Sequence, residues 1–347
     1  MKVIVAIDSF KGCLSSAEAN AAAREGILLS VPDAEIIEVP VSDGGEGWLD
    51  AFRTTVSGEL IEIEVCDPLL RPVMARYLKH NDEAVIEMAQ ANGLALLTSE
   101  ERNPLEATTY GTGQMIADAV RRGCRKIIVG LGGSATSDAG KGMMRALKDA
   151  FGEDLSDLKD VHFTIATDVR NPLYGPDGAA AVFAPQKGAT PDMVAELDRR
   201  AKVFAAQAAQ QMGFDRSMMP GAGAAGGLGY AFMQFLNAQC QPGIDLLLDA
   251  IGFQSLLQNA DLVITGEGSA DWQTLMGKLP TGILRRAQLF HIPVVLIAGR
   301  VANREDLLRA GFARVECINP PDLPLQEALL PHVAKANIRR LMKTYIP

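Results

Sequence analysis

Carboxylates, lysines and glycines follow three apolar runs that we read as buried strands. The polar residues are Asp8, Ser9 and Lys11 after 3–7, Asp43 after 35–41, and Glu267 and Asp271 after 261–265. In open parallel sheets, ligands bind beyond the carboxyl ends of the strands. Carboxylates at that edge can hold a hard metal ion or accept a proton. We therefore expect the three loops to contribute to one polar site, although Asp and Gly are also common in ordinary turns.

A second group of residues lies in a glycine-rich segment, 130–140, between an apolar run and a helical one. Backbone amides at such a junction can surround a phosphate, because glycine allows close approach and a helix N-terminus is electropositive. The segment is not a P-loop, since six residues separate Gly133 from Gly140. The candidate phosphate-binding residues are Gly132, Gly133, Ser134, Ala135, Thr136 and Asp138.

Further charged residues lie at predicted turns. Asp168 follows the run 163–166 and could bind a metal, act as a base, or simply cap the turn before Pro172. Lys11, Lys187 and Lys278 lie near or beside glycines and could neutralise an anion locally. Residues 221–226 match G-x-G-x-x-G, but no strand precedes them, so we predict a closely packed helix start there.

Charge and cysteine usage exclude several classes of protein. The 347 residues carry a net charge of −9, which disfavours nucleic acid and anionic membranes as partners. The five cysteines have no metal or redox spacing, as is typical of free thiols in a reducing cytoplasm. The N-terminus begins directly with a strand-like run and has no signal-peptide pattern. We therefore expect a cytoplasmic protein with a small-molecule substrate.

The order of elements that must position these residues indicates an α/β fold. Strand and helix signals alternate near both ends of the chain, which predicts a doubly wound parallel sheet of the flavodoxin or Rossmann kind. Alternating strands at 60–65, 73–78 and 84–88 instead predict a mixed sheet. We expect one discontinuous domain, residues 1–58 plus 258–347, and an inserted α/β domain, residues 59–257.

Ordered motifs along nearly the whole chain resemble the bacterial type I glycerate kinases. Examples are Ala6-Ile-Asp-Ser-Phe-Lys11, Ser42-Asp-Gly-Gly-Glu-Gly47, Gly132-Gly-Ser-Ala-Thr136, Pro185-Gln-Lys-Gly188 and Thr265-Gly-Glu-Gly268. The chain departs from the family pattern where arginine usually follows Gly-Glu-Gly, because Ser269 stands there. It also departs where the usual Asn-Asp-Gly is Ser137-Asp138-Ala139, and where the usual cysteine before Asp168 is Thr167.

The resemblance implies transfer of the ATP γ-phosphate to glycerate with Mg²⁺, and it favours 2-phosphoglycerate over 3-phosphoglycerate as product. Phosphoryl transfer needs positioning, charge neutralisation and a proton acceptor. We expect catalytic roles for Asp43, Asp168, Lys11 and Lys278. Substrate binding is predicted for Asp8, Ser9, Lys11, Glu267 and Asp271, and nucleotide binding for the glycine-rich segment and Lys187. Asp168 and Glu267 are the predicted metal ligands.

The sequence is compatible with other functions. One is a nicotinamide-dependent oxidoreductase of a small 2-hydroxy acid, which is disfavoured because no glycine fingerprint follows the first strand. Another is a non-catalytic two-domain solute-binding protein, which the missing signal peptide disfavours. The assembly state is open as well, with a homodimer as one option.

Overall fold

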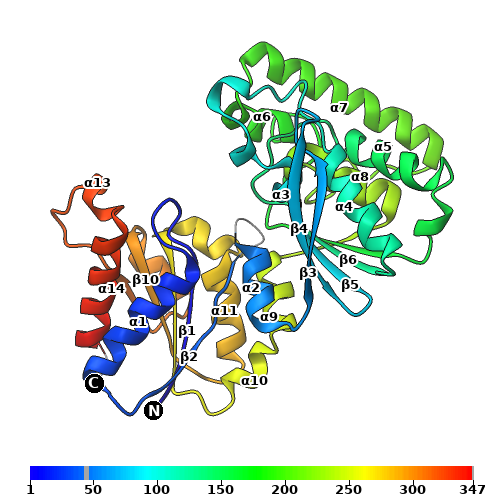
Figure 1. Ribbon diagram of the computed structural model, residues 1–347. Coiled ribbons are helices and arrows are strands. Elements are labelled where there is room, and N and C mark those ends of the chain that lie inside the picture. Colours follow the sequence, from blue (N-terminus) through cyan, green and yellow to red (C-terminus); the bar gives the residue numbers. More distant parts are fainter. Residues whose placement is uncertain (43–46, 346–347) are drawn as a thin grey trace. The chain divides into compact units, whose positions relative to one another are not determined.

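The computed structural model describes residues 1–42 and 47–345, and the chain divides into two compact units (Figure 1). Unit 1 consists of residues 1–43 and 244–347, and unit 2 consists of residues 44–243. Each unit has its own sheet. The domain boundaries near 58 and 258, expected from the pattern of elements, remain a prediction.

The sheet of unit 1 has five strands, and all of its neighbouring pairs are parallel. In spatial order they are β11 (Arg314–Cys317), β10 (Val294–Val301), β9 (Leu262–Ala270), β1 (Lys2–Ile7) and β2 (Glu35–Glu38). Chain order reverses direction between β1 and β9, so their carboxyl ends form a topological switch point of the flavodoxin-like kind. The prediction of a doubly wound parallel sheet is confirmed.

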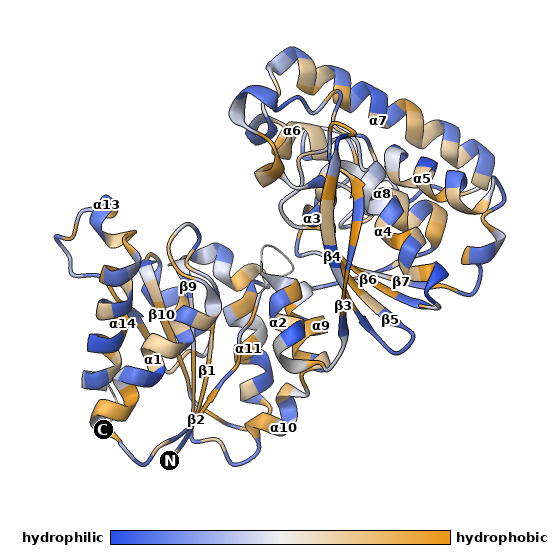
Figure 2. Cartoon of the chain, viewed as in Figure 1, coloured by the Kyte–Doolittle hydropathy of each residue, from blue (hydrophilic) through white to orange (hydrophobic). Residues whose placement is uncertain are grey.

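Helices cover this sheet because its strands are apolar on both faces. Strand β1 is buried from Val3 to Ile7, and Figure 2 colours the strands mostly hydrophobic. One face packs against α1 and α14, whose Ile27 and Ile338 join the core cluster of Val3 and Val5. The helices of this unit are α1 (Ser16–Ser30), α9 (Gly243–Ala250), α10 (Phe253–Leu257), α11 (Leu279–Gln288), α12 (Arg304–Arg309), α13 (Leu325–Ala328) and α14 (Pro331–Tyr345), with the 3₁₀ turn η5 (Trp272–Met276).

Local signals explain several element ends. Helix α1 begins after a capping box, in which the Ser15 hydroxyl accepts from the Glu18 amide and the Glu18 carboxylate accepts from the Ser15 amide. Helices α13 and α14 are separate at the end of the chain, because Pro331 has no amide to donate into a continuing helix.

Unit 2 contains a mixed sheet of six strands. Their spatial order is β3 (Glu59–Cys66), β4 (Pro72–His80), β5 (Glu83–Glu87), β6 (Lys126–Gly130), β7 (His162–Ala166) and β8 (Gln239–Gln241). The pairs β3·β4 and β4·β5 are antiparallel, and the remaining pairs are parallel. The fold class predicted from the sequence, a parallel sheet with a separate mixed sheet, is therefore confirmed.

The glycine-rich segment of unit 2 leaves the carboxyl end of β6 and leads into α5. A single aliphatic and aromatic core, including Ile127, Val129 and Phe232, supports that edge of the sheet. The helices are α2 (Trp48–Thr55), α3 (Ala89–Asn92), α4 (Tyr110–Arg121), α5 (Lys141–Phe151), α6 (Ala179–Phe183), α7 (Pro191–Met212) and α8 (Ala224–Leu236), with 3₁₀ turns η1 (Leu94–Leu96), η2 (Ser99–Glu101), η3 (Ser156–Leu158) and η4 (Pro185–Lys187).

Among the described residues, no helix combines the length and apolar character that crossing a membrane would require.

Gly26 tests the packing of α1 on α14. A Cβ atom there would lie 2.5 Å from the carbonyl oxygen of Arg339. Alanine improves helix propensity by about 1 kcal/mol over glycine, but overpacking costs about 1–3 kcal/mol. We expect Gly26→Ala to lower the free energy of unfolding, measured by urea denaturation. Ala21→Gly, on the exposed side of α1, measures the propensity effect alone. A more stable Gly26→Ala variant would contradict this packing.

Candidate active site

The carboxyl edge of the parallel sheet in unit 1 brings together residues that are far apart in sequence. The amide of Asp8 donates to the carbonyl oxygen of Gly266 at 2.9 Å, so the segment after β1 starts beside the end of β9. On the other side of β9, Glu267 is in register with Ala298 of β10. A ligand at this edge therefore meets side chains from three neighbouring strands.

Glu267 lies within a strand, which corrects the loop expected over 266–271. Strand β9 continues to Ala270 because β10 also continues, pairing through Val301. Gly266 permits this pairing, since a Cβ atom there would lie 2.4 Å from the carbonyl oxygen of Ile297. Strand alternation puts Glu267 and Ser269 on the same face of the sheet. The strand backbone thus holds Glu267 more rigidly than a loop would.

A cavity of 420 Å³ opens at this edge of unit 1. Five of the predicted site residues line it: Asp8, Ser9, Lys11, Glu267 and Lys278. The remaining lining residues are not among those predicted from the sequence: Phe10, Cys13, Gly268, Ser269, Gly299, Arg300, Ile318, Asn319, Leu325, Ala328 and Leu329. The cavity therefore combines carboxylates, cations and an apolar wall, as ligand-binding sites generally do.

Two buried carboxylates, two lysines and Arg300 set the charge of the cavity. Asp8 and Glu267 are 9% and 8% exposed. One oxygen of Glu267 accepts from the Thr274 hydroxyl at 2.5 Å, and the other lies 3.7 Å from the Lys278 ammonium. Lys11 is exposed on the turn after β1. At 3.7 Å the Glu267–Lys278 contact is loose, so the Lys278 ammonium keeps donors for a ligand.

Asp271 does not line this cavity. Its side chain caps the 3₁₀ turn η5, accepting from the amide of Gln273 at 2.8 Å. The Thr274 hydroxyl accepts from the Asp271 amide and donates to Glu267. Asp271 is thus connected to the cavity through Thr274, and its predicted contact with substrate stays a prediction. Asp43, predicted to be catalytic, lies outside the described residues.

The glycine-rich segment of unit 2 is built around a buried lysine. The Lys187 ammonium is 2% exposed and donates to the Ser134 hydroxyl at 2.7 Å and to the Thr136 carbonyl oxygen at 2.6 Å. Burial is the main cause that lowers its pKa from 10.5 to about 7, and Asp138 opposes the shift. Lys187 therefore joins Ser134 and Thr136 within this loop.

Several polar groups of the same loop have no partner within the described parts of the chain. The buried hydroxyls of Thr136 and Ser137 make no hydrogen bond there, and neither do the amides of Gly132 and Gly133. Buried polar groups in folded proteins are nearly always satisfied. The unpaired hydroxyl and amide donors near the buried Lys187 ammonium could bind an anionic ligand such as a phosphate.

Asp138 anchors this loop to two helices. One of its oxygens accepts from the Thr109 amide and hydroxyl, both at 2.9 Å, and from the Gly142 amide at 3.0 Å. The other accepts from the Gly140 amide at 3.0 Å. These bonds tie the starts of α4 and α5 together, which gives Asp138 a structural task. Its predicted contact with a nucleotide is untested.

The segment 221–229 packs against the same loop. Helix α8 is kinked at its start, where Ala225, Gly226 and Gly227 are left-handed with φ of 51°, 65° and 90°. Gly226 approaches closely, since a Cβ atom there would lie 2.0 Å from the Thr136 carbonyl oxygen. The G-x-G-x-x-G match is thus a closely packed helix start, as expected, and not a dinucleotide fingerprint.

Asp168 follows β7, the strand next to β6, and is partly buried. It therefore shares the carboxyl edge of the mixed sheet with the glycine-rich loop.

The parts of the chain that the structure describes contain no group of three or more His, Cys, Asp or Glu side chains suited to a metal. Phosphate-bound Mg²⁺ commonly uses only one or two carboxylates. Asp8 and Glu267, two oxygen donors on one cavity, fit that requirement.

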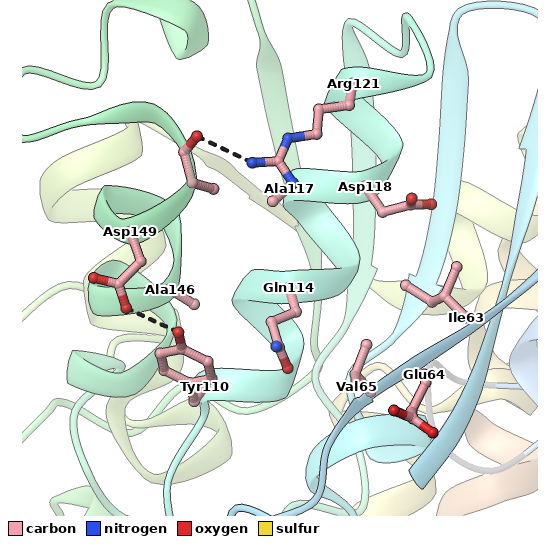
Figure 3. A pocket seen from close by; sticks show the side chains of 11 residues that line it. Ile63, Glu64, Val65, Tyr110, Gln114, Ala117, Asp118, Arg121, Ala146 and Asp149 are labelled. Atoms are coloured by element: carbon pink, nitrogen blue, oxygen red, sulfur yellow. Dashed lines mark hydrogen bonds between the residues drawn. The ribbon is translucent and has the colours of Figure 1, made fainter. Parts of the chain in front are cut away.

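A second cavity, of 470 Å³, lies beside β3, α4 and α5 of unit 2 (Figure 3). Tyr110 donates to Asp149 at 2.8 Å, and Arg121 donates to the Ala150 carbonyl oxygen at 3.1 Å. The Gln114 side chain accepts from the Cys66 amide at 2.7 Å. This cavity contains none of the predicted site residues, and we do not assign the reaction to it.

A doubly wound sheet with a charged cavity at its switch point, together with a phosphate-type glycine loop, is typical of α/β enzymes that act on small anions. The Glycerate kinase family model matches residues 3–155 and 153–346. The chain therefore belongs to the glycerate kinase family, and it is a kinase, a transferase of phosphoryl groups. The nicotinamide-dependent oxidoreductase finds no support.

Individual relatives agree with this family over nearly the full chain. The glycerate kinase of Bacillus subtilis (strain 168) is 42% identical over 354 residues, covering 94% of this chain and 93% of that protein. The glycerate 2-kinase of Escherichia coli (strain K12) is 40% identical, covering 87% and 86%. The crystal structure assigned to glycerate kinase 2 from Salmonella typhimurium LT2 superposes with a TM-score of 0.83 at 37% identity, covering 99% of this chain and 96% of that one.

The lowered pKa of Lys187 predicts that the stability of the protein depends on pH. Below about pH 7 both the native and the unfolded protein carry its proton, so the full cost of burying the charge is present. Between about pH 7 and the ordinary value of 10.5, only the unfolded chain keeps the proton. The stability of the wild type should then rise relative to Lys187→Met by about 1.4 kcal/mol per pH unit.

Urea denaturation of both proteins from pH 6 to 9.5 measures this difference. Lys202→Met, at an exposed position of α7, is the control and should show no such slope. A pH-independent difference between wild type and Lys187→Met would show that burial does not lower the pKa of Lys187.

Proposed function

We propose that this protein phosphorylates D-glycerate with ATP, giving phosphoglycerate and ADP, with 2-phosphoglycerate as the favoured product. Relatives named glycerate kinase and glycerate 2-kinase, at 42% and 40% identity, support the substrate and the position. We also propose that the protein acts in the cytoplasm, in keeping with its scattered free cysteines. The homodimer stays an open proposal.

The observation that carries this proposal is the cavity at the switch point of unit 1. Glycerate presents one carboxylate and two hydroxyls within a few ångströms. Lys11 and Lys278 supply charge for the carboxylate, and Asp8 and Glu267 supply acceptors for the hydroxyls. Charge-assisted hydrogen bonds of this kind are roughly twice as strong as neutral ones. In our proposal this cavity selects a small hydroxy acid.

We assign the phosphates of ATP to the glycine-rich loop of unit 2. The hydroxyls of Thr136 and Ser137 and the amides of Gly132 and Gly133 would donate to phosphate oxygens, and Lys187 would add positive charge beneath them. Such a preorganised set stabilises the charge that spreads over the transferred phosphoryl group.

Mg²⁺ would be held by Glu267 together with Asp8, which lines the same cavity, or by Asp168, and it would neutralise phosphate charge when bound. In the transfer itself, a glycerate hydroxyl oxygen bonds to the γ-phosphorus while the bond to the ADP oxygen breaks. The hydroxyl proton goes to a carboxylate, for which we propose Asp168 or Asp43. Asp168 lies two residues after the carboxyl end of β7.

The direct test is ADP release from Mg·ATP with D-glycerate, followed by ³¹P NMR of the product. We expect glycerate-dependent ADP formation, a single 2-phosphate resonance, and near-complete loss of turnover in excess EDTA. Full activity in EDTA would remove the metal from the proposal. Absence of ADP formation with glycerate across a range of concentrations would refute the function itself.

Lys278 has a well-matched control in the same unit. Lys278 and Lys335 are 36% and 43% exposed at their side chains, and each pairs with one glutamate, at 3.7 Å and 2.8 Å. Only Lys278 lines the cavity. Removing a charge-assisted contact costs about 1.5–3 kcal/mol, so Lys278→Ala should lower kcat/KM roughly tenfold to a hundredfold. Lys335→Ala should leave kcat/KM unchanged, and equal values for the two variants would exclude Lys278 from the site.

A further inference from the structure

Arg300 stands at the carboxyl end of β10, directly beside the cavity of unit 1. It is in register with Ser269 of β9 and lines the same cavity as Lys11 and Lys278. Register partners in a parallel sheet point to the same face, and neighbouring strands lie about 4.8 Å apart. The Arg300 side chain therefore starts from the strand next to Ser269 and on the face that also carries Glu267.

Within the part of the chain that the structure describes, the guanidinium of Arg300 makes no hydrogen bond or ion pair. Nearby arginines differ in this respect. Arg304 pairs with Glu316 at 2.7 Å, and Arg309 pairs with Asp306 at 3.1 Å. An arginine has five donors in a rigid planar fork. The N–H donors of Arg300 are available to a ligand that enters the cavity.

The backbone at Arg300 is held by its neighbours. The Gly299 carbonyl oxygen accepts from the Asn319 side chain at 2.8 Å. A Cβ atom on Gly299 would lie 2.8 Å from the Gly268 carbonyl oxygen and 3.6 Å from the Phe10 ring, so strand and loop pack tightly there. The Arg300 side chain is exposed while its backbone is fixed, which suits a residue that must bind a ligand in one defined geometry.

We propose that Arg300 binds the carboxylate of the hydroxy-acid substrate through both of its terminal nitrogens. This assignment rests on the function proposed above. Lys278 is partly occupied by Glu267, and lysine is a point charge, whereas the guanidinium fork matches a carboxylate in two parallel hydrogen bonds. In this proposal Arg300 also replaces the arginine that the family pattern has at position 269, because its guanidinium lies on the same face of the sheet and comes from the neighbouring strand.

The test compares Arg300→Ala with Arg309→Ala, an exposed control on α12. Losing a bidentate charge-assisted contact should raise the KM for D-glycerate about tenfold to a hundredfold. The KM for ATP should stay within about twofold, and Arg309→Ala should match the wild type. An unchanged KM for glycerate, or a rise confined to the KM for ATP, overturns the assignment. The latter would mean that Arg300 contacts phosphate.

The exchange variant Ser269→Arg/Arg300→Ser tests the geometry separately. It returns a guanidinium to the same face from β9, so we expect it to recover most of the affinity for glycerate that Arg300→Ser alone loses. Recovery no better than that of Arg300→Ser alone overturns the claim that the two positions serve one ligand group.

A thermal-shift measurement needs no turnover, so it separates this inference from the proposed kinase activity. D-Glycerate should raise the Tm of the wild type, and its uncharged methyl ester should do so far less. Arg300→Ala should respond weakly and equally to both compounds. If the variant still distinguishes acid from ester as the wild type does, Arg300 does not bind the carboxylate. If the wild type binds the acid in this way yet releases no ADP, only the kinase proposal fails.

Discussion

Strand β1 pairs in parallel with β9, although the whole of unit 2 separates them in the chain. The pairing runs from Val3 with Leu262 to Ile7 with Gly266, and the Thr265 hydroxyl donates to the Ala6 carbonyl oxygen, 259 residues earlier. Because both strands are apolar and buried, their register is held by the core on each face. Asp8 and Glu267 come next along these two strands, so the pairing decides that they share a cavity.

The two units provide different electrostatic environments. In unit 1, buried carboxylates lie near lysines, so the cavity has both acceptors and donors for a small polar molecule. In unit 2, the Lys187 ammonium is buried against a hydroxyl and a carbonyl oxygen, and no carboxylate of the described residues is hydrogen-bonded to it. Burying a cation lowers the free energy of unfolding unless an opposite charge compensates it. A bound phosphate would supply that opposite charge, which would explain why the lysine is buried here.

Much of this arrangement could be predicted from local patterns. The apolar run before Asp8 is a local signal, and strand β1 forms there as expected. The Ser15–Glu18 capping box is another local signal, and helix α1 begins directly after it. Glu267 was expected in a loop because its flanking glycines resemble a turn. Only the pairing with β10 shows that Gly266 and Gly268 belong to strand β9. Arg300 has no local signal at all, since its place beside Ser269 is a matter of register between strands. The Lys187–Ser134 bond likewise joins residues 53 positions apart.

Hydrogen–deuterium exchange with separate ligands tests the central claim that unit 1 binds the hydroxy acid and unit 2 binds the nucleotide phosphates. Bound ligand slows exchange in backbone segments that it orders. D-Glycerate should protect peptides covering residues 8–14 and 267–278, and a non-hydrolysable ATP analogue should protect peptides covering 131–142. The opposite assignment, with the analogue protecting 8–14 and glycerate protecting 131–142, would contradict the account.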